Sequence, residues 1–154
     1  MISKILNLIG LTPSNTTRIL YFHSFGNKEL DMDFDNFEKI VEKLISLGYI
    51  ICSLEKSRTI KSNKKIVFTF DDGYKNNFKA IKILNKYNSS GTIFMCTDYI
   101  GNGGIYKKTN LYPERNFLNE DNLIKIVDLG SEIGSHGKSH CNFNRISNQK
   151  LIDE

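Results

Sequence analysis

Short strand-like segments, most of them apolar, alternate with helical patterns and constrain the fold of this 154-residue chain more than any other feature. Each segment is about as long as an ordinary strand, and the five lie at residues 18–23, 49–54, 66–70, 92–97 and 132–135. Apolar side chains at helical spacing occupy much of the sequence between them. Because most of the segments are apolar at consecutive positions, both faces of the strands should be buried, as in parallel sheets covered by helices. The sequence therefore predicts an α/β fold built from parallel β/α units.

End signals mark the helices between these strands. Asp35 is the expected N-cap of the first helix, with Glu38 three residues on, and Gly48 is its expected C-terminal stop. Three further helices are predicted, over residues 76–87, over residues 120–129 and from Ser147 onward. Residues 56–65 form a basic connection, and residues 98–119 are predicted to be a long irregular loop of the kind that usually serves function.

Composition narrows the class of protein. A chain of this length with 40% hydrophobic and 25% charged residues is expected to be one globular domain. The formal net charge is +4, but the lysines are scattered singly and in pairs without aromatic interleaving, so no nucleic-acid partner is expected. Cys52, Cys96 and Cys141 are odd in number and widely spaced, which favours reduced thiols.

The N-terminal segment predicts where the protein resides. Its apolar stretch is interrupted by Asn7, is too short to cross a bilayer, and is followed by no small-residue cleavage site. No other segment has the length of a transmembrane span. The direct expectation is a cytoplasmic protein with no transmembrane segment.

Chemically active side chains gather where the predicted strands end. In parallel β/α folds, reacting groups collect at the C-terminal ends of the strands, because the loops there form the open mouth. The residues at or just beyond these ends are His23, Asp71, Asp72, Thr97, Asp98, His136 and His140. All three histidines of the chain belong to this set.

The two adjacent aspartates suggest a metal site. Asp71-Asp72-Gly73 could be a solvated turn, but two carboxylates after an apolar strand would repel unless a cation or proton compensates. Asp72, His136 and His140 supply one oxygen and two nitrogens and leave positions open for water, which is the pattern of catalytic zinc. Asp71, adjacent and unligated, is placed to deprotonate that water. The sequence thus predicts one divalent metal, with Zn²⁺ preferred.

Two other metal classes use similar ligands and are disfavoured. A helical HExxH protease needs Glu directly after its first His, and here Gly137 follows His136. A two-His, one-carboxylate iron oxygenase would need an antiparallel jelly roll and a His-x-Asp or His-x-Glu pair, which this sequence lacks.

The sequence also resembles a known family. Thr69-Phe-Asp-Asp-Gly-Tyr74 and Ile133-Gly-Ser-His-Gly-Lys-Ser-His-Cys-Asn142 resemble the first two signature motifs of the polysaccharide deacetylases, carbohydrate esterase family 4. The resemblance implies a distorted (β/α) barrel and metal-dependent hydrolysis of N-acetyl groups on sugar polymers. By the family pattern, Asp71 is the general base, and Asp72 joins His136 and His140 on the metal.

Residues 20–23 and 33–54 look like the N-terminal portion of the subgroup that deacetylates poly-N-acetylglucosamine. The deacetylase domain is therefore assigned to residues 18–154, with residues 1–17 as an N-terminal extension. In that subgroup an N-terminal strand supplies a histidine that acts as general acid, and His23 is the matching residue here. The alternative for His23 is a buried histidine hydrogen-bonded to a loop carbonyl.

The chain also departs from the family pattern. Gly137 stands where Ser or Thr is usual, and the family's later groove-lining motifs should lie beyond Glu154. Five strands cannot close a barrel that usually needs about 250 residues. The chain thus resembles the N-terminal part of a deacetylase domain, incomplete at its C-terminus.

Two functions follow from this resemblance. One is an N-acetylhexosamine polysaccharide deacetylase, and the other is an inactive remnant that binds metal or carbohydrate. The polymer, the oligomeric state and any partner protein are not specified by the sequence. The family resemblance would place the protein in the cell envelope or outside the cell instead of the cytoplasm.

Overall fold

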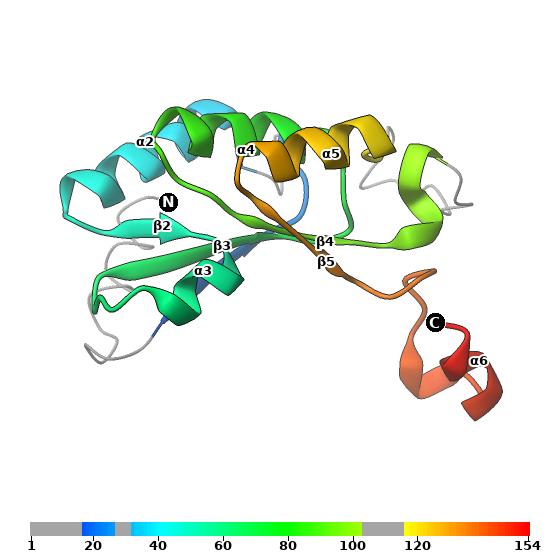
Figure 1. Cartoon of the computed structure of the whole chain (residues 1–154). Helices are drawn as coiled ribbons and strands as arrows, with labels where there is room; N and C mark the ends of the chain where they lie inside the picture. Colours follow the sequence, from blue (N-terminus) through cyan, green and yellow to red (C-terminus); the bar gives the residue numbers. More distant parts are fainter. Residues whose placement is uncertain (1–16, 27–31, 103–115) are drawn as a thin grey trace.

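The sheet is parallel throughout. A computed structural model describes residues 17–26, 32–102 and 116–154 of the chain (Figure 1). Its strands are β1 (Arg18–Phe22), β2 (Ile50–Cys52), β3 (Lys65–Phe70), β4 (Thr92–Met95) and β5 (Glu132–Ser135). They form one sheet in the order β1-β3-β4-β5, with β2 also paired to β3. Every pairing is parallel, so the predicted α/β class is confirmed, and within the described residues the sheet is not closed.

Three long helices cover one face of the sheet. They are α2 (Phe34–Ser46), α4 (Asn77–Lys86) and α5 (Glu120–Asp128), which lie side by side above the strands in Figure 1. The short helix α3 (Leu54–Thr59) lies on the opposite side. Two 3₁₀ segments, η1 (Thr97–Asn102) and η2 (Phe143–Arg145), precede and follow β5, and α6 (Asn148–Ile152) lies beyond the sheet near the C-terminus.

The core is built around β3, whose residues from Ile66 to Phe70 are all buried. Phe37 of α2 and Ile81 of α4 are fully buried against it. Phe22 stacks on Phe70 with ring centroids 5.6 Å apart, which extends the aromatic part of the core toward the end of β1. Burial of these large apolar side chains is the main driving force that holds the helical layer to the sheet.

Burial of both strand faces, expected from the sequence, does not hold for β1. Ile19 and Tyr21 are 52% and 70% exposed, while the alternate residues Leu20 and Phe22 pack against the core. Side chains at i and i+2 of a strand share a face, so one face of β1 is open to solvent. The described residues provide no layer that covers this face.

Some predicted element boundaries are wrong. The N-cap of α2 is Asp33, which accepts a hydrogen bond from Asn36 N at 2.7 Å, and Asp35 lies inside the first turn. The strand predicted over residues 49–54 is only β2, and the predicted connection contains most of α3. The strand predicted over residues 92–97 ends at Met95.

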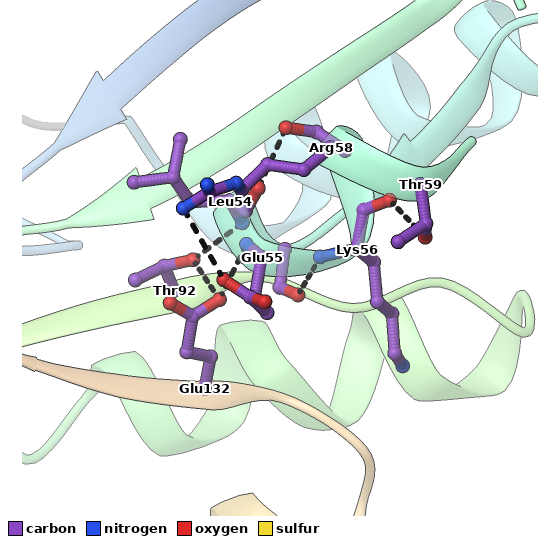
Figure 2. Close-up of polar contacts among 9 residues, drawn as sticks. Leu54, Glu55, Lys56, Arg58, Thr59, Thr92 and Glu132 are labelled. Carbon is purple, nitrogen blue, oxygen red and sulfur yellow. Dashed lines mark hydrogen bonds and ion pairs between the residues drawn. The ribbon is translucent and has the colours of Figure 1, made fainter. Parts of the chain in front are cut away.

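Helix α3 is held by the first residues of β4 and β5 (Figure 2). Leu54 N donates to Thr92 Oγ1 at 2.8 Å, and Glu55 N donates to Glu132 Oε2 at 2.9 Å. Thr92 Oγ1 in turn donates to Glu132 Oε2 at 3.2 Å. Two free N–H groups of the first helical turn are thus satisfied by side chains from two strands, which fixes α3 to the N-terminal ends of β4 and β5.

Several sequence predictions fall outside the described residues. They include all but the last residue of the extension at residues 1–17, and most of the loop at residues 98–119. Among the residues that are described, no helix has both the length and the apolar character needed to cross a membrane.

Candidate metal centre

Parallel strands bring the predicted site residues to one edge of the sheet. Asp71 and Asp72 directly follow β3, and His136 directly follows β5, with β4 between the two strands. His136 N donates to Met95 O at 2.9 Å, so the histidine segment is tied to the end of β4. The C-terminal ends of β3, β4 and β5 therefore form the edge at which the candidate site lies.

Asp72, His136 and His140 meet at a single carboxylate oxygen. Asp72 Oδ1 lies 3.4 Å from His136 Nε2 and 3.1 Å from His140 Nε2. One ligand atom from each residue lies within 4.8 Å of the other two, a spacing that could hold a metal ion. The Asp72 side chain is only 5% exposed, whereas the two histidine side chains are 34% and 39% exposed. The carboxylate thus forms the floor of the group, and the imidazoles border solvent.

The state of Asp72 Oδ1 fits a cation. This oxygen is buried and accepts no hydrogen bond. A buried carboxylate oxygen without a partner is costly, and a metal ion or a protonated imidazole would compensate it. Tetrahedral zinc ligands with bonds of about 2.0–2.1 Å would stand about 3.3 Å apart, which matches both contacts of Oδ1. Carboxylate oxygen and imidazole nitrogen are also the atoms that zinc binds in catalytic sites.

An unusual backbone conformation sets the position of Asp72. Its φ is 68°, in the left-handed region that few residues with a Cβ adopt, and Gly73 follows with a φ of 77°. Leu118 N donates to Gly73 O at 2.9 Å, which holds this turn from the other side. A strained backbone conformation of this kind persists only where contacts with the surrounding structure hold it in place. Such conformations cluster at functional sites.

The loop that carries the two histidines is anchored along its length. Thr97 N donates to Gly137 O at 3.3 Å, and Asp98 N donates to Lys138 O at 3.0 Å. The hydroxyl of Tyr99 donates to Ser139 O at 2.9 Å. Thr97 and Asp98, predicted to lie at the mouth, therefore support the histidine loop through their backbone.

Glu154 adds an anchor that sequence reasoning missed. Its carboxylate accepts hydrogen bonds from the backbone N and the hydroxyl of Ser139. These bonds lower the pKa of Glu154 to about 2. The Tyr99 contact was missed as well, since neither residue belongs to a motif and both act on a loop that only the fold brings near.

Gly137 occupies a position that suits glycine. Its φ is 76°, and His140, three residues later, has a φ of 57°. A loop that turns twice through the left-handed region can bring both imidazoles to the same oxygen. The departure from the family pattern at this position is therefore compatible with the geometry of the pair.

Asp71 lies beside the group without joining it. Its backbone N donates to Phe22 O at 2.8 Å, which ties it to the end of β1. Burial raises the pKa of the Asp71 carboxyl, and the neighbouring Asp72 raises it further. Positive charge on His136, His23 and His140 lowers the same pKa, and burial has the largest effect.

His23 follows β1 at the same edge. Its ring lies edge-on to Tyr21 with centroids 5.8 Å apart, and the residue is exposed, which contradicts the buried alternative. Charge on His23 favours the ionised form of Asp71, so the two side chains interact electrostatically. His23 is not one of the residues that could hold the metal, and its role as general acid stays a prediction.

Comparisons with known proteins agree with the residue pattern. A family model described as "Polysaccharide deacetylase" matches residues 58–154. The Bacillus subtilis protein YxkH, whose name describes a candidate polysaccharide deacetylase, is 29% identical over 144 residues. That match covers 88% of this chain and 47% of YxkH.

Solved structures show the same arrangement of elements. A Bacillus anthracis protein, also a candidate polysaccharide deacetylase, superposes with a TM-score of 0.71 at 26% identity, covering 87% of this chain and 43% of that one. IcaB from Ammonifex degensii superposes with a TM-score of 0.65 at 16% identity, covering 78% of this chain and 52% of IcaB. At that identity the likeness to IcaB concerns the fold alone. The chain spans about half the length of these relatives.

Proposed function

Because this chain belongs to the polysaccharide deacetylase family, we propose that it is a metal-dependent hydrolase acting on an N-acetylhexosamine polysaccharide. The reaction adds water across the amide, breaks the carbon–nitrogen bond, and yields acetate and a free amine on the sugar. One observation carries the proposal. One oxygen of Asp72, which accepts no hydrogen bond, faces two imidazole nitrogens, next to a second carboxylate that burial makes more basic.

We assign the metal to Asp72, His136 and His140, with zinc as the proposed ion. When bound there, zinc would supply a Lewis acid that polarises the acetyl carbonyl and makes water more acidic. The two exposed imidazoles leave the open side of the group toward solvent, from which a polymer could approach.

Asp71 is the proposed general base. Its carboxylate takes a proton from the attacking water, which is the task of a base adjacent to the metal but not bound to it. Burial raises the pKa of Asp71 and so makes the carboxylate a better proton acceptor than an exposed aspartate. Its backbone bond to Phe22 O holds the residue in place while it does so.

His23 is the proposed general acid. As an imidazolium it would deliver a proton to the departing amine nitrogen, so that the sugar leaves as an amine and not as an unstable anion. Exposure of the ring to solvent allows it to be protonated again between turnovers. Charge on His23 lowers the pKa of Asp71, which is consistent with two groups at one edge of the sheet that act on one substrate bond.

The test combines metal analysis with an activity assay. Wild-type protein and an Asp71→Asn variant are loaded with zinc, and acetate release from chitin oligomers is measured. We expect both proteins to retain one equivalent of zinc, while the variant loses about 10²-fold or more in rate, because the amide keeps the shape but cannot accept the proton.

Two outcomes would count against this proposal. Near wild-type turnover in Asp71→Asn would place the base elsewhere. Stoichiometric zinc without acetate release in the wild type would favour the second function, a remnant that binds metal or carbohydrate without turnover.

A further inference from the structure

Asn76 occupies a capping position without capping. It is the N-cap residue of α4, where an Asn side chain normally accepts a hydrogen bond from the backbone of the first turn. Here φ is −70° and ψ is −16°, already helical, and the side chain makes no capping bond. The helix therefore gives no local reason for the amide side chain at this position.

The amide of Asn76 reaches a different segment instead. Asn76 Nδ2 donates to Phe25 O at 2.7 Å and to Ser24 Oγ at 3.0 Å. These partners lie about fifty residues earlier in the chain, directly after His23. Asn76 Oδ1 is buried and accepts no hydrogen bond, so the described contacts of the side chain are made by its donor end.

Hydrogen bonds hold the residues on both sides of His23, and those on its C-terminal side come from Asn76. On one side of the histidine, Phe22 O accepts the backbone N–H of Asp71 at 2.8 Å. On the other side, Ser24 and Phe25 are held by Asn76. Both sets of bonds come from the segment between β3 and α4, which also carries Asp72.

Packing buries Phe25 in this loop, whereas the ring of His23 lies exposed. Phe25 is 5% exposed and stacks on Phe34 with ring centroids 4.9 Å apart. His23 itself is exposed and is bordered by the equally exposed Tyr21. The polar bonds of Asn76 add to this packing and act on the two residues that directly follow His23.

We propose that Asn76 is a positioning residue, whose side-chain amide fixes the loop after β1 to the turn after β3 and so holds His23 at the edge of the sheet that carries Asp71. The hydrogen bonds from Asn76 to Ser24 and Phe25 involve no metal. Their catalytic consequence rests on the proposed function, through the role given to His23.

The first experiment needs neither metal nor substrate. Asn76→Asp keeps the shape of the side chain, removes both N–H donors, and leaves a residue that is favoured at an N-cap, so α4 should persist. Hydrogen exchange of the amides of residues 24–26 should become about tenfold faster, the change expected when a hydrogen bond of ordinary net strength is lost. The nuclear Overhauser contact between the His23 and Tyr21 rings should weaken in parallel. Asn76→Ala, which adds no charge, should behave in the same way.

A matched control is available on the same helix. Asn85 Nδ2 donates to Leu129 O at 3.2 Å, so Asn85→Asp also removes a side-chain bond to a backbone carbonyl, at the opposite end of α4 from Asn76. It should leave residues 24–26 and the His23 ring contact unchanged. Equal exchange and equal ring contacts in Asn76→Asp and Asn85→Asp would overturn the proposal, whether or not the protein proves to be a deacetylase.

The second experiment measures the catalytic consequence. In zinc-loaded protein, Asn76→Asp should lower kcat for acetate release about tenfold, with KM and zinc content unchanged. Asn85→Asp should keep wild-type kcat. Faster hydrogen exchange of residues 24–26 with unchanged kcat would show that the Asn76 bonds are purely structural, and would overturn the positioning role. An inactive wild type would refute the proposed function, and the ring contact of the first experiment would then decide the positioning of His23 by itself.

Discussion

Asp72 is a carboxylate in a place that is unfavourable for a charge. It is buried, its backbone lies in the left-handed region, and one of its oxygens accepts no hydrogen bond. Each of these features costs free energy, and residues of this kind are retained where surrounding structure or a ligand compensates them. The group with His136 and His140 is the compensation that the fold offers.

Removal of one imidazole should abolish metal binding. His140→Ala deletes one nitrogen that faces Asp72 Oδ1, so zinc affinity should fall by orders of magnitude, since a catalytic zinc site depends on three protein ligands. His23→Ala is the control, because His23 is also a histidine at this edge but lies outside the group. Zinc titration of the two variants separates them. Equal stoichiometry in wild type and His140→Ala would show that the ligand assignment is wrong.

Gly73 is constrained by conformation and by space together. A Cβ at this position would approach Met95 Sδ far inside van der Waals contact, and φ is 77°. Gly73→Ala should therefore lower the free energy of unfolding by about 2–4 kcal/mol, as overpacking adds to the left-handed penalty. Gly101→Ala is the control, since its φ is 65° with nothing near the added methyl, and about 1–2 kcal/mol is expected. Urea denaturation measures both, and equal losses would contradict the role of the Met95 contact.

At the scale of elements, the strands were predictable and one helix was not. The segments that form β3 and β5 place Asp71, Asp72 and His136 at one edge, and this follows from the alternation of strands with helices and from parallel pairing. Helix α3 has only six residues and too short an apolar pattern to be recognised. Its first turn is held by Thr92 and Glu132, 38 and 77 residues away, which no local signal encodes.

The N-cap of α2 shows a second limit of sequence reasoning. Asp33 and Asp35 both precede apolar residues at helical spacing, and both residue types favour the cap. Asn36 decides between them, because its backbone N and its Nδ2 both donate to Asp33 at 2.7 Å. The left-handed conformations of Asp72 and His140 were equally beyond prediction, since tertiary contacts impose them.

The contact between α4 and α2 should respond to alkaline pH. The Tyr87 hydroxyl donates to Glu42 Oε1 at 2.6 Å and lies 2.9 Å from Glu38 Oε1. The bond to Glu42 is the largest cause that raises the pKa of Tyr87, to about 12. Because the folded pKa lies above the ordinary value of 10, the stabilisation is complete below pH 10 and is lost as the pH rises through 12.

Tyrosinate absorbance tests this expectation. One of the seven tyrosines should ionise late, and Tyr87→Phe should remove that late step. Tyr21→Phe, which removes an exposed tyrosine, should retain it. A late step that survives in Tyr87→Phe would assign it to another residue.

At the scale of the whole molecule, the described part of the sheet exposes apolar surface along β1. Ile19 and Tyr21 share one open face, and β1 has only β3 as a neighbour in the described residues. Exposed strands with apolar side chains are templates for association. The 154-residue chain should therefore self-associate in solution.

A charge on that face should reduce the association. Ile19→Lys places a cation on the strand, which is how natural edge strands avoid pairing. Leu47→Lys is the control, because Leu47 is also an exposed apolar residue but follows α2 instead of lying in a strand. Light scattering should show smaller particles for Ile19→Lys alone. A monodisperse monomer in the wild type would contradict the prediction.

The bonds of Thr92 and Glu132 to α3 lie at the opposite end of the strands from Asp72 and His136. Contacts at the N-terminal ends of parallel strands maintain stability, while those at the C-terminal ends perform chemistry. A directed-evolution library restricted to the α3 contacts should therefore change thermal tolerance and leave the group of Asp72, His136 and His140 unaltered.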